Sequence, residues 1–385
     1  MKIILCSAVF SPATQFGGLV TWAAQAAHEL AVRGHEVTVL ATDLGAKGAP
    51  RSEVLPDGVC IERDHGWNFG GLLARPALAR VARRAVASAD LVVVSGFWQG
   101  PVAAVCEAAR DAGIPAVLVP HGGLSPWVWA RRAPLKRAFF KFRGARAIAA
   151  ASAVHFVSDR EAGTAIGLSA DTRRIVSPPG VDFDFWMPDD DEREVARAGA
   201  AVSQRKAMLA WAGRFHPVKG LDLLPAAFAP FARLDWELVL VGHDHESEVA
   251  ASLNRAFADA GIGNKVVFVG GLDAASLRAL LRSADGFVLP SLHESFGFAA
   301  AEAAACGCAV AVSDACGIAG AAAGDGFAVL PHEPPAWTDW LRAVITRVAG
   351  GRRSAGCRER LEPILSMRAS WDRTDALYRE IAAKR

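Results

Sequence analysis

Short apolar segments alternate with alanine-rich segments along most of this chain, and this alternation limits the fold more than any other feature of the sequence. Apolar runs such as 91–95 and 207–212 have the length of strands, and a helical pattern follows each of them. A repeated order of strand, helix and strand predicts an α/β fold with parallel, doubly wound sheets. The expected strands are 2–10, 36–41, 91–95 and 115–119 in the first half, and 207–212, 237–241, 266–269, 286–290 and 309–313 in the second.

An acidic, irregular stretch near 182–194 separates these two series of strands. The length of 385 residues also favours two domains, each large enough to bury its own core. Ligands of such sheets bind outside the carboxyl ends of the strands. We therefore expect a site at those ends, facing a cleft between the domains.

Composition excludes several classes of protein. The formal charge is only +2, which gives no global nucleic-acid-binding character. Hydrophobic residues make up 52% of the chain, but much of this is alanine, and no run approaches the roughly 18 apolar residues of a membrane span. The N-terminal apolar stretch is interpreted as a first strand, because a helix follows it at once. We expect a cytoplasmic protein, with its seven scattered cysteines as reduced structural thiols and with no metal site.

A loop in the second half carries a carboxylate between a strand and a helix. The run His293-Glu294-Ser295-Phe296-Gly297 follows strand 286–290, and the helix expected over 297–305 contains Glu302. The first amides of a helix lack intrahelical acceptors, so those of Ser295, Phe296 and Gly297 suit an anion or sugar hydroxyls. The helical rise places the two glutamates about 10 Å apart, too far to share a proton but suited to two anchor points on one long ligand. Without these flanks, two solvated glutamates would be the favoured interpretation.

Two cations follow the first strand of the second half. Gly213-Arg214 and Lys219-Gly220 lie between strand 207–212 and a helix expected over 221–232. Arginine offers phosphate a fork of donors and lysine adds a flexible point charge, so the pair can neutralise a diphosphate without a metal. A solvated surface is the plain alternative for two such residues.

Two candidates lie in the first half. Gly17 and Gly18 precede the helix expected over 19–32, where paired glycines permit close backbone approach to a phosphate. His121 follows strand 115–119 and so faces the same expected cleft. A Gly-Gly pair is more often a plain turn and a lone histidine is usually structural.

The segment from Arg131 to Arg146 is the one charge run of the chain. It carries seven Arg and Lys residues, no acid, and aromatic residues between them. Such a helix can lie on an anionic membrane surface with its aromatic side chains among the headgroups. A solvated cationic face with the aromatic residues turned inward is equally compatible with the pattern.

These motifs together resemble glycosyltransferase family 4, a family of retaining, nucleotide-sugar-dependent enzymes with the GT-B fold. The resemblance rests on the Glu294 to Glu302 spacing with Phe296-Gly297, on Arg214 and Lys219 with their glycines, and on the sequence around His121. Pro178-Pro179-Gly180-Val181-Asp182 is similar to the Pro-Asn-Gly-Val-Asp segment that joins the two domains of the family, with Pro179 in the Asn place. The chain departs from the family at Gly317-Ile318-Ala319-Gly320, where Gly-Ile-Pro-Glu is common.

The resemblance implies a division of roles. Catalytic contacts fall to His121 and Glu294, donor-phosphate contacts to Gly17, Gly18, Arg214 and Lys219, and the ribose contact to Glu302. Glu294, Ser295, Phe296 and Gly297 are implied to bind the donor sugar. His121 is implied to lie near the reacting sugar, where it either orients the sugar or stabilises charge, and no metal or cofactor is implied.

The resemblance also implies a domain plan and an activity. The plan is an N-terminal Rossmann-like acceptor domain over 1–182, a linker over 183–205, a C-terminal Rossmann-like nucleotide-sugar domain over 206–368, and a helix over 369–385 that returns to the first domain. The implied activity is metal-independent, retaining transfer of a hexose from a nucleoside diphosphate sugar to a hydroxyl of a glycan or lipid-linked acceptor, in cell-surface polysaccharide or glycolipid synthesis. Such an enzyme would be cytoplasmic, with peripheral contact at the inner face of the membrane through Arg131 to Arg146. The alternative is a degenerate GT-B protein that binds nucleotide or a partner without turnover.

Overall fold

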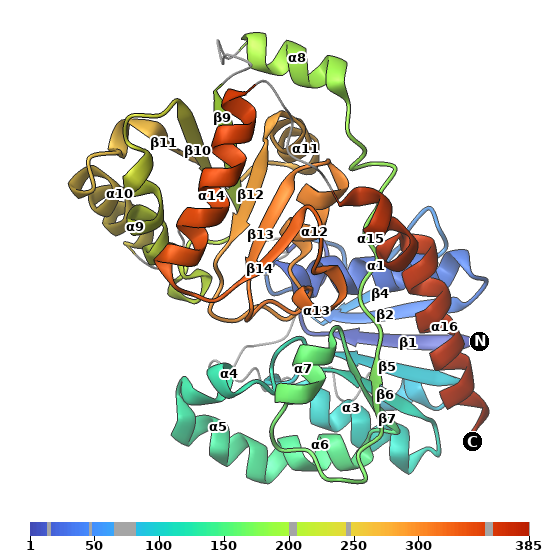
Figure 1. Cartoon of the computed structure of the whole chain (residues 1–385). Coiled ribbons are helices and arrows are strands. Elements are labelled where there is room, and N and C mark those ends of the chain that lie inside the picture. Colours follow the sequence, from blue (N-terminus) through green and yellow to red (C-terminus); the bar gives the residue numbers. More distant parts are fainter. Residues whose placement is uncertain are drawn as a thin grey trace. The chain divides into compact units, whose positions relative to one another are not determined.

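The protein is represented by a computed structural model (Figure 1), which describes residues 1–13, 17–45, 48–64, 82–199, 206–243, 248–350 and 357–384. The chain forms two compact units. The first comprises Met1–Gly180 together with Met367–Arg385, and the second comprises Val181–Ser366. The boundaries expected at 182 and 369 lie two residues from these divisions.

The first unit is built on an eight-stranded sheet in the order β3-β4-β2-β1-β5-β6-β7-β8. All neighbouring strands are parallel except β3 and β4, which form an antiparallel edge. The strands are β1 (Lys2–Ser7), β2 (Glu36–Thr42), β3 (Ser52–Val54), β4 (Cys60–Asp64), β5 (Leu91–Ser95), β6 (Ala116–Val119), β7 (Ala153–Phe156) and β8 (Arg174–Val176). Every residue of β5 and β6 is buried, as expected for parallel strands covered on both faces.

Helices cover this sheet and connect its strands. They are α1 (Gly18–Val32), α3 (Gly100–Asp111), α4 (Pro126–Ala130), α5 (Ala133–Phe139), a π-helical turn (Phe140–Gly144), α6 (Ala145–Ala150), α7 (Asp159–Thr164) and α16 (Met367–Ala383). The last of these lies beside α1 although it comes from the other end of the chain (Figure 1).

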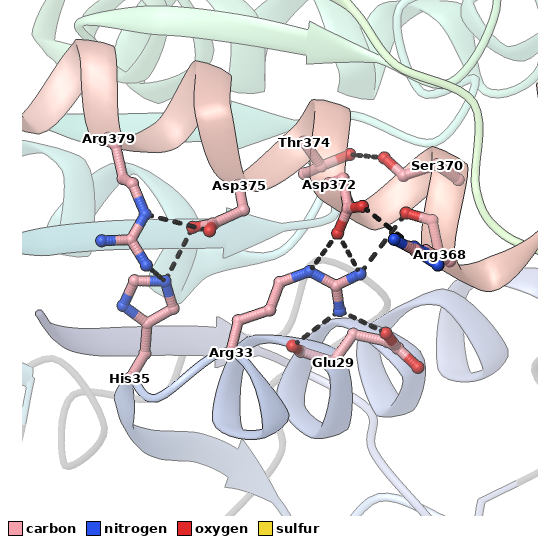
Figure 2. A network of polar contacts seen from close by, with 9 residues as sticks. All are labelled: Glu29, Arg33, His35, Arg368, Ser370, Asp372, Thr374, Asp375 and Arg379. Carbon is pink, nitrogen blue, oxygen red and sulfur yellow. Dashed lines mark hydrogen bonds and ion pairs between the residues drawn. The ribbon is translucent and has the colours of Figure 1, made fainter.

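Charged side chains fasten α16 to the start of the first unit. Figure 2 shows Arg33, at the end of α1, between Glu29 and Asp372. His35 Nε2 lies 2.7 Å from Asp375 Oδ1, and Arg379 donates to the other oxygen of the same carboxylate. The returning helix is therefore held by the Arg33–Asp372 ion pair, by the hydrogen bond of His35 with Asp375, and by the packing of Trp371 against Trp22.

A buried polar contact adds to this attachment. His155 Nδ1 lies 2.9 Å from the hydroxyl of Tyr378, and His155 Nε2 lies 2.9 Å from the carbonyl oxygen of Ser177. Because a carbonyl only accepts, Nε2 carries the proton and Nδ1 accepts from Tyr378. Burial lowers the pKa of His155 to about 4, in agreement with this neutral ring.

The second unit contains a six-stranded sheet in the order β11-β10-β9-β12-β13-β14. All of its strand pairs are parallel. The strands are β9 (Ala207–Ala212), β10 (Trp236–Val241), β11 (Val266–Val269), β12 (Gly286–Leu289), β13 (Ala309–Ser313) and β14 (Phe327–Leu330). The predicted α/β fold with two doubly wound parallel sheets is confirmed.

The helices of the second unit include one departure from the prediction. They are α8 (Asp190–Gly199), α9 (Leu224–Phe228), α10 (Val249–Asp259), α11 (Ala274–Ser283), α12 (Phe298–Ala305), α13 (Ala319–Ala322), α14 (Pro334–Ala349) and α15 (Arg358–Leu365). The single helix expected over 221–232 is instead a short α-helix between two 3₁₀ turns, Leu221–Leu223 and Ala229–Phe231. Pro225 and Pro230 begin new turns there, because proline lacks the N–H that a continuous helix requires.

The segment expected as the start of a linker, 183–199, belongs to the second unit. Arg193 of α8 is buried and donates from Nη1 to the carbonyl oxygens of Arg282, Ser283 and Ala284, at the C-terminal end of α11. Its Nη2 pairs with Asp285 at 2.6 Å, and the second oxygen of Asp285 accepts the amide of Met208. One guanidinium thus caps a helix and neutralises a buried acid.

Replacing Arg193 with methionine should strongly destabilise the second unit. The change removes the ion pair that Arg193 makes with the buried Asp285 and the donors to three carbonyls, which should cost about 3 to 5 kcal/mol of the free energy of unfolding. Urea denaturation followed by tryptophan fluorescence measures this loss. The matched control is Arg233→Met, at an exposed arginine, which should change stability by less than about 0.5 kcal/mol. An equal effect of the two substitutions would contradict the structural role of Arg193.

Candidate active site

The clearest candidate site of the second unit is an ion pair at the carboxyl ends of β9 and β12. Lys219 Nζ pairs with Glu294 Oε2, although the two residues are 75 positions apart. Both side chains are mostly buried, with 17% and 21% of their surface exposed. Ser291 Oγ lies 3.5 Å from the same carboxylate oxygen. The structure therefore brings together two residues that the sequence analysis assigned separately.

The backbone fixes the loop that carries Glu294. The Glu294 amide donates to Ala315, and the Glu294 carbonyl accepts from Gly317, so the loop pairs with the segment after β13. The Phe296 carbonyl accepts from Ile318 at 2.8 Å. The Gly317-Ile318 segment thus holds the Glu294 loop by backbone hydrogen bonds, and the departure from the family pattern falls on the next two residues, Ala319 and Gly320.

Two glycines are required by geometry at this edge of the sheet. Gly297 precedes α12 with a φ of 114°, a value that residues other than glycine rarely adopt. Gly220 has a φ of 60°, and a Cβ there would lie 2.3 Å from the carbonyl oxygen of Pro290. Backbone conformation therefore requires glycine directly after Lys219 and three residues after Glu294.

Two backbone donors are available beside the carboxylate. Phe296 and Gly297 are buried, and within the described part of the chain their amides have no acceptor. These are two of the three amides expected to meet an anion or sugar hydroxyls, and the third belongs to Ser295, which is half-buried. The loop can therefore offer both an acceptor and donors to one ligand.

Arg214 follows β9 as expected. Its side chain is exposed, and no described residue pairs with its guanidinium. It lies on the same β9 connection as Lys219, whose position is fixed by Glu294. The loop thus carries one fixed cation and one solvated cation.

Glu302 lies on α12, a helix of alanines packed into the second unit. Five alanines of this helix are buried, whereas Glu302 is half-buried. Burial raises the pKa of Glu302 to about 7, and none of the described residues donates a hydrogen bond to its carboxyl group. The full acceptor capacity of this carboxylate is therefore available to a ligand.

In the first unit, Gly17 and Gly18 stand at the start of α1. Gly17 has a φ of 65° and accepts the amides of Val20 and Thr21 through its carbonyl oxygen. Both glycines are exposed, and a Cβ at Gly17 would meet nothing within 4 Å. Glycine is required there by backbone conformation, not by crowding.

His121 lies at the carboxyl end of β6, and its φ of 49° is in the left-handed region. Its Nε2 is 3.0 Å from Ser95 Oγ, and its ring meets the edge of Trp22 with centroids 4.9 Å apart. Burial, with a further contribution from His155, lowers the pKa of His121 to about 3. His121 is therefore neutral at physiological pH, and Trp22, one turn into α1, places it close to the Gly17-Gly18 end of that helix.

The basic segment divides into an inward and an outward set of apolar side chains. Trp129 packs edge-to-face against Trp98 and at a tilt against Phe140, so these aromatic rings face the protein. Phe142 is 65% exposed and Leu135 is 47% exposed. The exposed cations around them are Arg131, Arg132, Arg137, Lys141, Arg143 and Arg146. Neither interpretation made from the sequence describes the whole segment.

The cysteines and the possible metal ligands form no further site among the described residues. All seven cysteines are free thiols, six are buried, and burial raises the pKa of Cys6, Cys306 and Cys316 to about 12. Within the described ranges, no three His, Cys, Asp or Glu residues gather as metal ligands would. The His243-Asp244-His245 run lies partly outside those ranges, since residues 244 to 247 are not described. No described helix has the length and hydropathy of a membrane span.

Family profiles match both units of the chain. One described as "Glycosyltransferase Family 4" covers residues 16–185, and one described as "Glycosyl transferases group 1" covers residues 206–347. The chain belongs to glycosyltransferase family 4. The predicted family is thereby confirmed, and the two profiles together match most of the chain.

Three curated relatives of this family 4 chain share one name. A D-inositol 3-phosphate glycosyltransferase of Gordonia bronchialis is 29% identical over 90% of this chain and 81% of its own length. Proteins of the same name from Jonesia denitrificans and Geodermatophilus obscurus are 30% and 35% identical over 46% and 53% of this chain. The matched region spans less than half of these last two relatives, 44% and 46% of their lengths.

Solved structures share the fold. A sucrose-phosphate synthase from Thermosynechococcus elongatus superposes with a TM-score of 0.77 at 20% identity, over the whole of both chains. Anabaena Alr3699/HepE in complex with UDP and glucose gives a TM-score of 0.75 at 19% identity, over 98% of this chain and 99% of that one. This family 4 chain therefore has the GT-B fold that the sequence predicted.

Three residues of the candidate site were missed from the sequence. Ser95 and Trp22 contact His121, and Glu161 accepts the amide of the next residue, Gly122. Ser95 ends an apolar strand, which is a signal that marks ligand-facing positions in parallel sheets. Ser158 and Glu161 have the spacing of a helix capping box. This spacing accounts for the glutamate on its own, so the sequence gives no sign of its contact with Gly122.

The raised pKa of Glu302 predicts a stability effect that depends on pH. A carboxyl group with a raised native pKa favours folding most below its ordinary value of 4.5, and this contribution is lost as pH rises through about 7. Glu302→Gln should therefore raise the free energy of unfolding by about 1 to 3 kcal/mol at pH 8 and change it little at pH 4.5. Urea denaturation at both pH values measures the difference. Glu333→Gln, at an exposed glutamate of the same unit, is the matched control, and the same profile in both variants would contradict the assignment.

Proposed function

We propose that this family 4 chain is a retaining hexosyltransferase that moves a sugar from a nucleoside diphosphate sugar to a hydroxyl group. The observation that carries the proposal is the ion pair of Lys219 with Glu294, beside the Phe296 and Gly297 amides. An ammonium group has three donors, so Lys219 can keep Glu294 and still donate to a phosphate oxygen. Glu294 is in turn held as an acceptor for a sugar hydroxyl next to the leaving diphosphate.

Each further residue takes a role that its environment supports. Arg214 supplies a solvated guanidinium to the diphosphate, because its fork of donors suits phosphate oxygens. Glu302 binds the ribose hydroxyls, which would provide the donors that its carboxylate lacks. Gly17 and Gly18 offer backbone amides at the start of α1 to the donor phosphates.

His121 acts as a neutral group in this proposal. With a pKa lowered to about 3, it is not a cation for the diphosphate, so it orients the transferred sugar by hydrogen bonding. Neutralisation of the leaving diphosphate falls to Lys219 and Arg214, without a metal. Retention means that the anomeric configuration of the donor is kept in the product, which the anomeric proton signals of the product would report directly.

The acceptor is proposed as a glycan or a lipid-linked sugar, for cell-surface polysaccharide or glycolipid synthesis. The curated relatives are named for transfer to D-inositol 3-phosphate, so an anionic polyol is the second acceptor to test. UDP-glucose occurs in the Anabaena HepE complex and is a suitable first donor. A degenerate protein without turnover remains the alternative, and assays with these substrates separate it from an enzyme.

Loss of the lysine should abolish most transfer while the fold persists. Lys219→Met removes a charged donor to the leaving group and should lower kcat/KM roughly 100- to 1000-fold. UDP at 100 times its Kd should stabilise the wild type by about 2.7 kcal/mol, and this shift should fall in the variant. Donor turnover and thermal unfolding with UDP-, GDP-, ADP- and TDP-sugars measure both effects.

Matched substitutions of arginine make this test specific. Arg214→Met should also weaken donor binding, whereas Arg233→Met, at another exposed arginine of the same unit, should not. Stabilisation by nucleotide without turnover of any donor would favour the degenerate alternative. Full activity in Lys219→Met would refute the proposed diphosphate site.

We also propose that the Arg131 to Arg146 segment docks on an anionic membrane surface. Six exposed cations surround two exposed apolar side chains, Leu135 and Phe142. Basic residues near an anionic surface each contribute about 1 kcal/mol, and an apolar side chain that leaves water adds to this. Peripheral contact of this kind would bring the first unit to a lipid-linked acceptor.

Vesicle co-sedimentation tests the docking surface. The wild type should sediment with phosphatidylglycerol vesicles and remain in solution with phosphatidylcholine vesicles. Leu135→Ala combined with Phe142→Ala should lower the bound fraction at least tenfold, because buried apolar surface is lost. Leu234→Ala, at a leucine of similar exposure in the second unit, should bind as the wild type does. Equal sedimentation with both lipids would eliminate the electrostatic proposal.

A further inference from the structure

The first unit contains a buried carboxylate that the proposed reaction does not use. Glu161 lies in the first turn of α7 and is only 4% exposed. Its Oε1 accepts the amide of Gly122, and its Oε2 accepts the amide of Val157 at 2.8 Å. Within the described residues no cation pairs with it, so backbone donors alone stabilise this carboxylate.

Those two amides belong to the connections that follow neighbouring strands. Gly122 follows β6 and Val157 follows β7, and the two strands pair in parallel. Because parallel strands end at the same edge, one carboxylate can reach both connections. Glu161 therefore joins the His121 loop to the end of the adjacent strand.

The loop that Glu161 holds has an unusual backbone. His121 and Gly122 both have left-handed φ values, 49° and 75°. For a residue with a side chain this conformation is unfavourable, and it persists only where the surroundings enforce it. The Gly122 amide is the first donor after His121, so an acceptor at that point fixes the orientation of the peptide group that His121 contributes.

Other contacts fix the ring or the outer part of the loop. Ser95 and the edge of Trp22 hold the imidazole of His121, and the indole of Trp98 donates to the Gly123 carbonyl at 2.7 Å. A turn from Pro120 to Gly123 closes the loop. Among the described residues, the contact of Glu161 is the one made to the peptide between the two left-handed residues.

We propose that Glu161 is a positioning residue, which holds His121 in its left-handed conformation by accepting the Gly122 amide. This inference rests on the proposed function only through the catalytic contact of His121. Glu161 itself touches no reacting group in this proposal. Its effect on transfer passes entirely through the backbone and ring of His121.

The test uses Glu161→Gln in the full chain. Glutamine keeps the shape but has one acceptor oxygen, so its NH₂ group must face one of the two amide donors. The kcat should fall roughly 10- to 100-fold, as for other residues that orient an active-site group, with the donor KM changed less than about twofold. Asp159→Asn, the same chemical change at an exposed position of α7, is the matched control and should retain wild-type kcat.

A spectroscopic measurement separates this inference from the proposed function. With isotope-labelled histidine, the ring signals of His121, assigned through His121→Asn, should shift in Glu161→Gln, while those of His332 in the second unit should not. This result does not require turnover. If the wild type transferred no sugar but the His121 signals moved, the proposed function would fail and the positioning role would stand.

A double-variant comparison excludes a merely structural role. Glycine adopts a φ of 49° without strain, so in a His121→Gly background Glu161→Gln should cause little further loss of activity and a smaller fall in Tm than in the wild type. Equal losses in both backgrounds, unchanged His121 signals, or failure to fold in both backgrounds would each overturn the proposal. Folding of the double variant where the single variant does not fold would support it.

Discussion

The parallel pairing of β9 with β12 is the constraint on which the candidate site of the second unit depends. Residues Gly286 and Phe287 pair with Leu209 and Ala210, so the two strands end at the same edge of the sheet. That edge then receives Lys219 from one connection and Glu294 from the other. An antiparallel pair would send one of these loops to the opposite edge, and the ion pair would not form.

The same constraint explains the small residues around the site. α12 packs against β12 and β13 through alanines, which allow close approach of a helix to a sheet. Gly297 begins this helix in a conformation that other residues avoid. Glu302 is the one charged residue of α12, and its raised pKa reflects the apolar surroundings that this packing creates. A carboxyl group that disfavours folding at neutral pH is expected at a functional position.

The sequence predicted features whose causes are local. Patterns among nearby residues show the alternation of strands and helices, the glycines and the family motifs. These patterns were sufficient to predict the parallel sheets and the places of Arg214 and His121 at the ends of strands. Contacts between residues that are far apart in the sequence could not be predicted in this way. Arg193 falls within the range expected as a linker. No local pattern reveals that its guanidinium caps α11 and pairs with Asp285. Pro225 and Pro230 also interrupt the helix expected over 221–232, because each lacks the amide donor that a continuous helix needs.

Electrostatics divides the candidate residues into two kinds. Lys219 and Glu294 are held as an ion pair, so each charge has an opposite charge beside it. In the first unit, His121 and Glu161 have no opposite charge beside them among the described residues. Burial lowers the pKa of His121 to about 3 and raises that of Glu161 to about 7. A neutral imidazole carries no charge for a phosphate, which is why the proposed role of His121 is a hydrogen bond to a sugar hydroxyl. The amides of Gly122 and Val157 lower the Glu161 pKa against the larger effect of burial, and each of them donates to one carboxyl oxygen.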